Sequence, residues 1–372
     1  MKPISSVTRM VSALFALAIS FTALAEIPQL KLVNAYPNLK VKRPLWMQQL
    51  PDGRTFLLEQ RGKVYLLPKN ANGKSTTLFF DIEKRKPYVK DEEGLLGMAF
   101  HPQFAKNGKF YAFYSAHKPL RSVVSEFRVS KGGTIDLATE RKLLTIQRPF
   151  WNHDGGCILF GPDGMLYITT GDGSTDSDQL VSGQSLDDLL GSVLRIDVRQ
   201  ATTRHPYTVP PDNPFFDQPG ARPEIWAYGL RHPQHFSWDT DGRMFIGDIG
   251  QNQVEEVNLG RAGANYGWRL REGTFATGYA AGRGPGPVYP RPAEDDREFV
   301  YPVAQYDHDE GNAVGGGFVY RGQAIPELRG KYVFADFPRG RLLAIDADEL
   351  DTDRPAECDP NAGPLHACRR GQ

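Results

Sequence analysis

The sequence repeats one phrase: a turn containing Asp-Gly or Asn-Gly, a short strand in which apolar residues alternate, and a second polar turn. Copies begin near Pro51, His101, Pro162 and Asp241, and a looser copy begins at Leu328. Glycine after Asp or Asn supplies the positive φ of a tight hairpin, while aromatic and β-branched residues supply a pleated surface for burial. The repeat therefore predicts an all-β chain built from hairpins.

The spacing of these copies limits the architecture further. They recur at roughly 50–90 residues, as expected for four-stranded blades in which some copies have degenerated. We therefore expect a six-bladed β-propeller; a pair of β-sandwiches is the alternative, although it would not explain the repeated phrase. Residues 199–223 and 271–298 are rich in Pro, Gly and charge, and we expect them to form long loops over one face.

The first 25 residues have the pattern of an export signal. Lys2 and Arg9 are their only charges, residues 10–24 are mostly apolar, and Ala23–Ala25 forms a small-x-small cleavage site. The apolar run is too short for a comfortable membrane span, and we expect no span in the mature chain. The sequence predicts a cleaved signal peptide over 1–25 and a periplasmic or secreted protein.

The remaining length and charge indicate one large neutral domain. Because closed all-β folds run long as single domains, we expect a propeller over 26–346, followed by a loose tail over 347–372. The chain carries 44 Lys and Arg residues and 44 Asp and Glu residues. This balance gives no reason to expect nucleic acid or an anionic membrane surface as a partner.

Three cysteines are too few for a disulfide scaffold. Cys358 and Cys368 lie ten positions apart in the tail, where an oxidising compartment would allow them to pair. Cys157 is left over. We interpret it as a small buried residue, with a reactive thiol as the less favoured alternative.

The strongest candidate for chemistry is His153, which lies in a polar, glycine-rich turn where no apolar pattern calls for a histidine. A strand follows this turn and ends in a second polar turn that carries Asp172. Two such turns can lie at the same end of a sheet, so the imidazole and the carboxylate can meet. That pairing is what a general base needs; a structural histidine in a turn is the alternative.

Three further polar turns interrupt the strands without a packing reason. They carry Glu92, the pair Arg231 and His232, and the amide-rich sequence around Gly250 and Gln251. Taken singly, each has a plain structural explanation: a solvated turn, an ion pair with a neighbour, or side chains bonded to their own backbone. In a propeller, however, these turns can converge on one mouth of the central channel, which favours a binding site.

Five stretches resemble motifs of the glucose/sorbosone dehydrogenase family: Glu93–Pro102, Asn152–Gly156, Gly191–Asp197, Gly229–Pro233 and Asn265–Trp268. The resemblance extends from about residue 29 to residue 345. It implies a soluble six-bladed propeller whose enzymes use pyrroloquinoline quinone (PQQ) together with calcium.

The resemblance also implies roles for particular residues. His153 matches the base that takes the proton from the C1 hydroxyl of a sugar as hydride passes to the quinone. Asp172 matches the carboxylate that orients this histidine, and Arg231 the arginine that stabilises negative charge on the reduced cofactor. These roles suit the chemistry of the side chains.

Two further matches concern the substrate and the metal. Glu92 falls where the family has a glutamine that contacts the substrate. Gly250 and Gln251 fall where two backbone carbonyl groups bind the catalytic calcium, an ion that prefers oxygen ligands. The redox chemistry itself would belong to the cofactor.

The sequence also departs from the family pattern. His232 stands where the PQQ enzymes generally carry asparagine, and residues 305–312 replace a Trp- and Pro-rich segment. The lysine expected to hold the carboxylates of the quinone is missing, and Arg339, Arg341 and Arg61 are the cations that would replace it. In these departures the chain is similar to the Hedgehog-interacting-protein-like branch.

The first functional hypothesis is an exported quinoprotein dehydrogenase that oxidises an aldose-type sugar. No Cys-x-x-Cys-His haem site is present in the sequence, so electrons would pass to a separate acceptor. The second hypothesis is a non-catalytic propeller that binds a glycan or a protein partner. A calcium-dependent lactone hydrolase is the third, since fold alone does not fix function.

Overall fold

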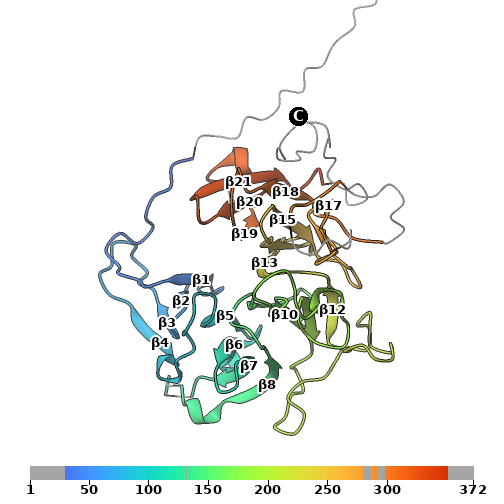
Figure 1. Ribbon diagram of the computed structural model, residues 1–372. Helices are drawn as coiled ribbons and strands as arrows, with labels where there is room; N and C mark the ends of the chain where they lie inside the picture. The colour runs from blue at the N-terminus through green and yellow to red at the C-terminus, as the bar shows by residue number, and fades with distance from the viewer. Residues whose placement is uncertain (1–29, 131, 134, 280–285, 291–297, 351–372) are drawn as a thin grey trace, which may run out of the picture.

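The computed structural model describes residues 30–350 except 131, 134, 280–285 and 291–297. The expected signal peptide over 1–25, most of the expected tail and the pair Cys358 and Cys368 lie outside the described residues. Figure 1 shows the chain coloured from its N-terminal to its C-terminal end. Within the described part, no helix has the length and apolar character needed to cross a bilayer.

Four antiparallel sheets of four strands and one of three form the body of the protein. The four-stranded blades consist of β1 (Pro44–Gln49), β2 (Thr55–Glu59), β3 (Lys63–Leu66) and β4 (Thr77–Asp81); β5 (Leu95–Phe100), β6 (Lys109–Ala116), β7 (Arg121–Arg128) and β8 (Arg141–Gln147); β9 (Gly155–Phe160), β10 (Leu166–Thr170), β11 (Ser192–Ile196) and β12 (Ile225–Tyr228); and β13 (Pro233–Trp238), β14 (Met244–Asp248), β15 (Val254–Leu259) and β18 (Ala304–Asp307). The fifth blade contains β19 (Val314–Val319), β20 (Lys331–Asp336) and β21 (Arg341–Asp346).

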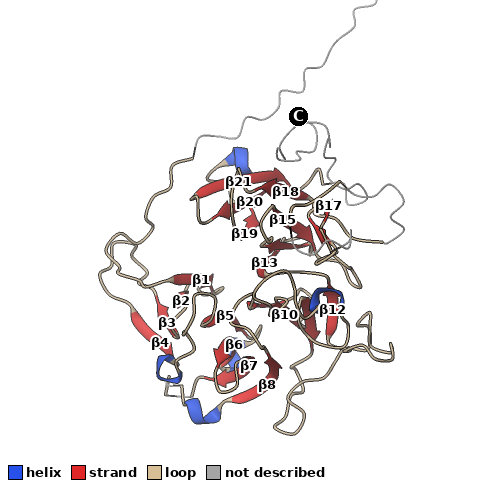
Figure 2. Ribbon diagram, viewed as in Figure 1, coloured by secondary structure: helices blue, strands red, loops and turns tan. Residues whose placement is uncertain are grey.

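Helical structure in the described residues is limited to single turns. These are α1 (Phe104–Asn107), η1 (Glu83–Arg85), η2 (Leu137–Thr139), η3 (Ser182–Gln184) and η4 (Pro326–Leu328). Figure 2 shows how strands and loops dominate the molecule. The prediction of an all-β propeller is confirmed.

The prediction of six blades is wrong: the described residues form five. Each copy of the repeated phrase marks the first hairpin of one blade, and the sequence holds five copies, so no degenerate copy was needed. Much of the remaining length goes into two long connections, residues 197–224 between β11 and β12 and residues 260–303 between β15 and β18. The second contains a small separate sheet, β16 (Arg271–Glu272) with β17 (Phe275–Ala276).

The glycines of the phrase fold as the sequence predicts. Gly53, Gly164 and Gly242 turn the chain between the first and second strands of three blades, with φ of 83°, 77° and 88°. A side chain disfavours this region of φ, whereas glycine adopts it without steric cost. The Asp-Gly pairs therefore fix where each of these hairpins reverses.

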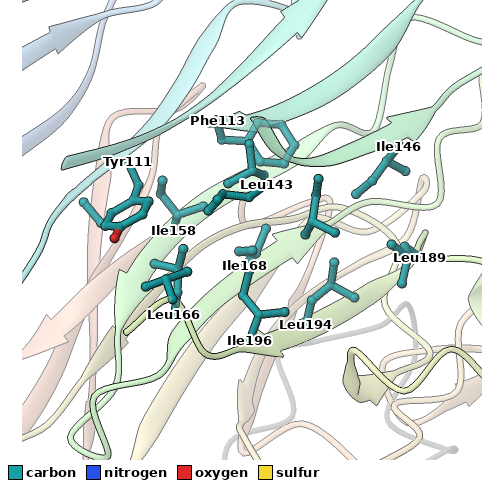
Figure 3. Close-up of a cluster of buried hydrophobic side chains, with 14 of the residues drawn as sticks. Tyr111, Phe113, Leu143, Ile146, Ile158, Leu166, Ile168, Leu189, Leu194 and Ile196 are labelled. Atoms are coloured by element: carbon teal, nitrogen blue, oxygen red, sulfur yellow. The ribbon is translucent and has the colours of Figure 1, made fainter. Parts of the chain in front are cut away.

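The core lies between neighbouring blades. Figure 3 shows one buried cluster in which side chains of β6 and β8 pack against those of β9, β10 and β11. Tyr111, Ile158, Leu166 and Leu194 are all at most 1% exposed. Cys157 is also buried and is a free thiol. Burial raises its pKa to about 12, which fits the interpretation of a packing residue rather than a nucleophile.

Candidate active site

The first strands of neighbouring blades contact one another, β5 with β9, β9 with β13 and β13 with β19, so they line the centre of the ring. We call the end at which these strands begin the site face. It carries the loops that precede the first strands of the second to fifth blades and the loops that join second to third strands: 60–62, 90–94, 117–120, 148–154, 171–191, 229–232, 249–253, 308–313 and 337–340. Every residue that the sequence proposed for catalysis or for cofactor, substrate or metal binding lies in these loops or directly beside them.

His153 and Asp172 meet on this face. His153 Nδ1 lies 2.7 Å from Asp172 Oδ1, and the two residues are 3% and 0% exposed. Gly171 makes the approach possible, because a Cβ atom there would lie only 2.0 Å from the His153 carbonyl oxygen. His153 itself adopts a φ of 55°, a conformation that is uncommon for residues other than glycine and that concentrates at functional sites.

Asp172 is held through both carboxylate oxygens. Oδ1 also accepts the backbone N–H of Ser174, and Oδ2 accepts the indole N–H of Trp268 at 2.7 Å. Burial alone would raise the pKa of Asp172, but the neighbouring His153 and Arg231 outweigh it and hold this pKa below its ordinary value. Asp172 is therefore ionised at neutral pH.

Arg231 completes the cluster. Its Nη2 lies 2.8 Å from His153 Nε2, its Nη1 donates to the Ile249 carbonyl oxygen and its Nε donates to Gln251 Oε1. The guanidinium carbon also lies 5.6 Å from the centroid of the Trp268 ring. With these contacts the guanidinium has one defined orientation, which points toward the imidazole.

These contacts determine the proton on His153. An ionised carboxylate only accepts hydrogen bonds, so Nδ1 must carry the hydrogen that faces Asp172. A guanidinium only donates, so Nε2 must be the acceptor that faces Arg231. The imidazole is therefore neutral, with its lone pair on Nε2, which is the form that can act as a base.

Glu92 and His232 lie beside this cluster. Glu92 Oε2 accepts the backbone N–H of His153 at 2.5 Å and lies 3.3 Å from His232 Nδ1. Burial lowers the pKa of His232 to about 4. Burial alone would raise the pKa of Glu92, but the two neighbouring imidazoles keep it below its ordinary value. Glu92 therefore supplies a carboxylate that is one-third exposed at the edge of a buried site.

Asp248 fixes the turn that carries both Arg231 and His232. Its two oxygens accept the backbone N–H groups of these residues at 3.0 and 2.7 Å. Burial raises the pKa of Asp248 to about 7 and also raises that of Glu256, which stands opposite Asp248 in the sheet. Two buried carboxyl groups so close together resist ionising at the same time.

The turn of Gly250 and Gln251 is organised by Glu272. Its Oε1 accepts four consecutive backbone N–H groups, those of residues 251–254, at 2.8–3.1 Å. In a trans peptide the carbonyl points opposite to the N–H of the following residue, so the carbonyl groups of Gly250 and Gln251 both face away from Glu272. Two adjacent carbonyl oxygens on one side are a donor set that suits calcium.

Side-chain metal ligands do not gather in the same way. Within residues 30–350, leaving aside the undescribed gaps, no three His, Cys, Asp or Glu side chains form a group suited to a metal ion. The side chain of Gln251 serves a different purpose, since its Oε1 accepts N–H groups from both Arg231 and Ser177. Any calcium at this turn would therefore depend on backbone oxygens.

The three arginines expected to hold the quinone lie apart from His153. Arg339 donates to the side chain of Asn312 and to the carbonyl oxygens of Asp309 and His308, and Arg341 donates to the carbonyl oxygen of Glu310. Both therefore brace the loop over residues 308–313. Arg61 is exposed, with its guanidinium 4.8 Å from the ring centroid of Tyr88, and keeps an accessible charge on the site face.

Sequence reasoning missed Trp268 and Glu272. Both come from the connection over 260–303, which leaves β15 and runs beside the end of β12 through a bridge between Tyr228 and Asn265. The motif Asn265–Trp268 was a usable signal, because it places a large aromatic residue in a segment otherwise rich in Pro and Gly. Nothing local in the sequence indicates that Glu272 binds the amides of a turn some twenty residues earlier.

Two known proteins are similar to this chain over most of its length. HIPL2 protein of Arabidopsis thaliana is 32% identical over 365 residues, which cover 80% of this chain and 51% of the relative. Hedgehog-interacting protein of Homo sapiens is 32% identical over 321 residues, which cover 82% of this chain and 42% of the relative. The chain spans about half the length of the curated relatives it matches.

Solved structures agree on the fold. The PQQ-bound form of aldose sugar dehydrogenase from Streptomyces coelicolor matches with a TM-score of 0.64 and 24% identity, covering 84% of this chain and 80% of the other. The family described as glucose/sorbosone dehydrogenase matches residues 41–359. This match includes all five blades and every loop of the site face, so the chain belongs to the glucose/sorbosone dehydrogenase family.

Proposed function

We propose that the chain is an exported sugar dehydrogenase that oxidises an aldose-type sugar at C1 with PQQ and calcium, and that it delivers the electrons to a separate acceptor. The observation that carries this proposal is the neutral imidazole of His153, held between an ionised carboxylate and a guanidinium. Membership of a family described as glucose/sorbosone dehydrogenase supports the reaction class. The sequence of residues 1–25 supports export.

In this proposal His153 Nε2 takes the proton of the sugar hydroxyl as hydride leaves C1. Asp172 keeps the hydrogen on Nδ1 and stabilises the imidazolium that forms, as the orienting carboxylate of a catalytic triad does. Before the sugar can reach Nε2, Arg231 must give up its bond to that atom. The freed N–H then faces the oxygen on which negative charge grows, and this lowers the barrier electrostatically.

The residues present fit the cofactor at its reacting end. Arg231 would contact the quinone oxygens, the carbonyl groups of Gly250 and Gln251 would hold the calcium ion, and His232 and Arg61 would border the cofactor. When bound, PQQ would accept the hydride and calcium would polarise it as a Lewis acid. Arg339 and Arg341 are occupied by the loop over 308–313, so the carboxylates of PQQ would rely on Arg61.

A titration with PQQ tests the proposal. The native chain and the His153→Ala variant are loaded with calcium, titrated with PQQ, and assayed for dye reduction with a panel of aldoses. We expect a change in the quinone spectrum for both proteins, and dye reduction for the native chain only. Absence of both signals in the native chain with every aldose would contradict the proposal, and lactone hydrolysis without any acceptor would favour a hydrolase.

A second candidate is a non-catalytic propeller that binds a glycan or a protein through the same face. The engagement of Arg339 and Arg341 with backbone carbonyl groups favours it, because it removes two of the cations that a tricarboxylate would need. Similarity to a protein named Hedgehog-interacting protein points the same way. This candidate predicts that a ligand found by glycan or protein arrays binds the native chain and His153→Ala equally well.

A further inference from the structure

Trp268 enters the active site from outside the blades. It lies in the connection over 260–303, and its backbone is fixed on both sides: its N–H donates to the Gly229 carbonyl oxygen at 2.9 Å, and its carbonyl oxygen accepts from Gln184 Nε2 at 2.6 Å. The residue is 5% exposed. Its indole is therefore delivered to one place on the site face.

That place adjoins two members of the catalytic cluster. The indole N–H donates to Asp172 Oδ2 at 2.7 Å, and the Arg231 guanidinium carbon lies 5.6 Å from the ring centroid. The N–H therefore fixes the rotation of the carboxylate, and the ring offers its negative face to the cation. One side chain thus holds both neighbours of His153.

The hydrogen bond to Asp172 does more than give a buried indole N–H an acceptor. Asp172 is 0% exposed; its Oδ1 faces His153, and its Oδ2 accepts the indole N–H of Trp268. Without this donor, Oδ2 would face a buried environment with its charge uncompensated, which is costly. More negative charge would then concentrate near His153 and stabilise the protonated imidazole.

We propose that Trp268 is a positioning residue that sets both the basicity of His153 and the orientation of Arg231. As a statement about catalysis this rests on the function proposed above. As a statement about the imidazole it does not, because the contacts belong to the protein without cofactor. The substitution Trp268→Phe removes the N–H while it keeps an aromatic ring, so it isolates the hydrogen bond.

Trp238 provides the matched control. It is also partly buried among aromatic rings, with its ring centroid 5.0 Å from that of Tyr167, and its indole nitrogen has no hydrogen-bond partner in the described structure. Trp238→Phe therefore makes the same chemical change away from His153. Urea unfolding of both variants shows how much each substitution costs in stability.

The first measurement needs no activity. Imidazole ¹⁵N NMR of the cofactor-free protein follows the tautomer and titration of His153, assigned by comparison with His153→Gln. We expect a single Nδ1–H tautomer in the native chain and in Trp238→Phe, and loss of that single tautomer in Trp268→Phe. If the two Trp variants give the same His153 spectrum and titration, the proposal is overturned.

The second measurement uses the protein loaded with PQQ and calcium. We expect Trp268→Phe to lower kcat roughly 10- to 100-fold with KM within about threefold, and to move the acid limb of the pH–rate profile upward. Trp238→Phe should change neither quantity by more than about twofold. Equal kcat values in the two variants would overturn the catalytic part. A native chain that oxidises no sugar would reject the proposed function and leave the NMR result to decide the positioning role.

Discussion

The two sides of the site face are built differently. On the side of the third and fourth blades, His153, Asp172 and Arg231 are at most 7% exposed and bond to one another. On the side of the first and fifth blades, Arg61, Arg339 and Arg341 are exposed and either bond to the loop over 308–313 or stack on a neighbouring ring. Both sides carry residues that the sequence proposed for the site, but only on the first side are these residues in contact with one another.

The difference lies in what the arginines of each side bind. The buried side is braced by carboxylates beneath the turns, since Asp248 holds the backbone of the Arg231 turn and Glu272 holds that of the Gln251 turn. On the exposed side a buried carboxylate, Asp336, likewise accepts the backbone N–H groups of Asn312 and Ala313. There, however, Arg339 and Arg341 also bind the loop over 308–313. An arginine whose N–H groups are bound to a neighbouring loop is not free to hold a ligand. Charge type alone therefore does not identify a binding residue.

The largest expected effect separates the two sides by activity. Under the proposed function, His153→Ala should lower kcat by about 10²- to 10⁴-fold, because a positioned general base contributes this much. Arg339→Ala should leave kcat within about twofold, since its guanidinium binds backbone carbonyl groups remote from His153. Dye-linked initial rates measure both. A large loss of kcat in Arg339→Ala would show that the exposed side of the site face also takes part in catalysis, which would contradict this comparison.

A second test compares stability. Beneath His153, Arg148 pairs with Asp154, and the two side chains are 1% and 0% exposed; burial lowers the pKa of Arg148 to about 10. Because Arg148→Met leaves a buried carboxylate without its partner, we expect it to lower the free energy of unfolding by about 3–5 kcal/mol. Arg339→Met, on the exposed side, should cost less than about 1 kcal/mol. Urea denaturation of both variants checks this, and equal costs would contradict it.

The pH dependence of stability gives a third test. The raised pKa of Asp248, about 7, means that the folded chain keeps a proton that the unfolded chain has already released. Stability should therefore decline as the pH rises from about 4, where the unfolded carboxyl begins to lose its proton, to about 7, where the folded one does, and Asp248→Asn should flatten this decline. Asp239→Asn is the control, because Arg321 lowers the Asp239 pKa to about 2 and the group is ionised throughout this window. Urea midpoints that show the same decline in Asp248→Asn and the native chain would contradict the assignment.

The smallest effect concerns Arg61. As an exposed cation on the site face, it should contribute to PQQ binding about as much as a surface ion pair does, 0.2–1 kcal/mol. Arg61→Ala should therefore weaken PQQ binding by about 1.5- to 5-fold and leave kcat at saturating PQQ unchanged. Fluorescence titration measures the affinity. A loss of PQQ affinity greater than a hundredfold would contradict this prediction and would group Arg61 with the buried site residues of the third and fourth blades.

The fold could be predicted from the sequence wherever short-range chemistry decided it. The Asp-Gly turns at Gly53, Gly164 and Gly242 lie at the hairpins they indicated. The number of blades was wrong, because the spacing of copies does not separate blade strands from a long connection such as 260–303. What such a connection touches depends on the three-dimensional path of the chain.

The same limit applies to the site. The turns of His153 and Asp172 could be expected to meet, and they do so because two strands, β9 and β10, separate them and return the chain to the same end of the blade. Gly171 permits the close approach there. The role of Trp268 could not be expected, because its contact with Asp172 spans 96 positions. The isolation of Arg339 from His153 also depends on tertiary structure, since it follows from the path of the loop over 308–313.

Each described blade is made from one continuous stretch of chain, taken in order. No strand near the N-terminal end of the described residues joins a sheet near their C-terminal end. Within these residues, therefore, no β-ladder of backbone hydrogen bonds links the first blade to the fifth. Side chains close the seam between these two blades instead: the ring of Trp46 in the first blade is tilted against that of Phe318 in the fifth, with centroids 6.0 Å apart, and stacks on His235 of the fourth blade at 5.3 Å. Such a ring can part at its seam while every sheet stays whole.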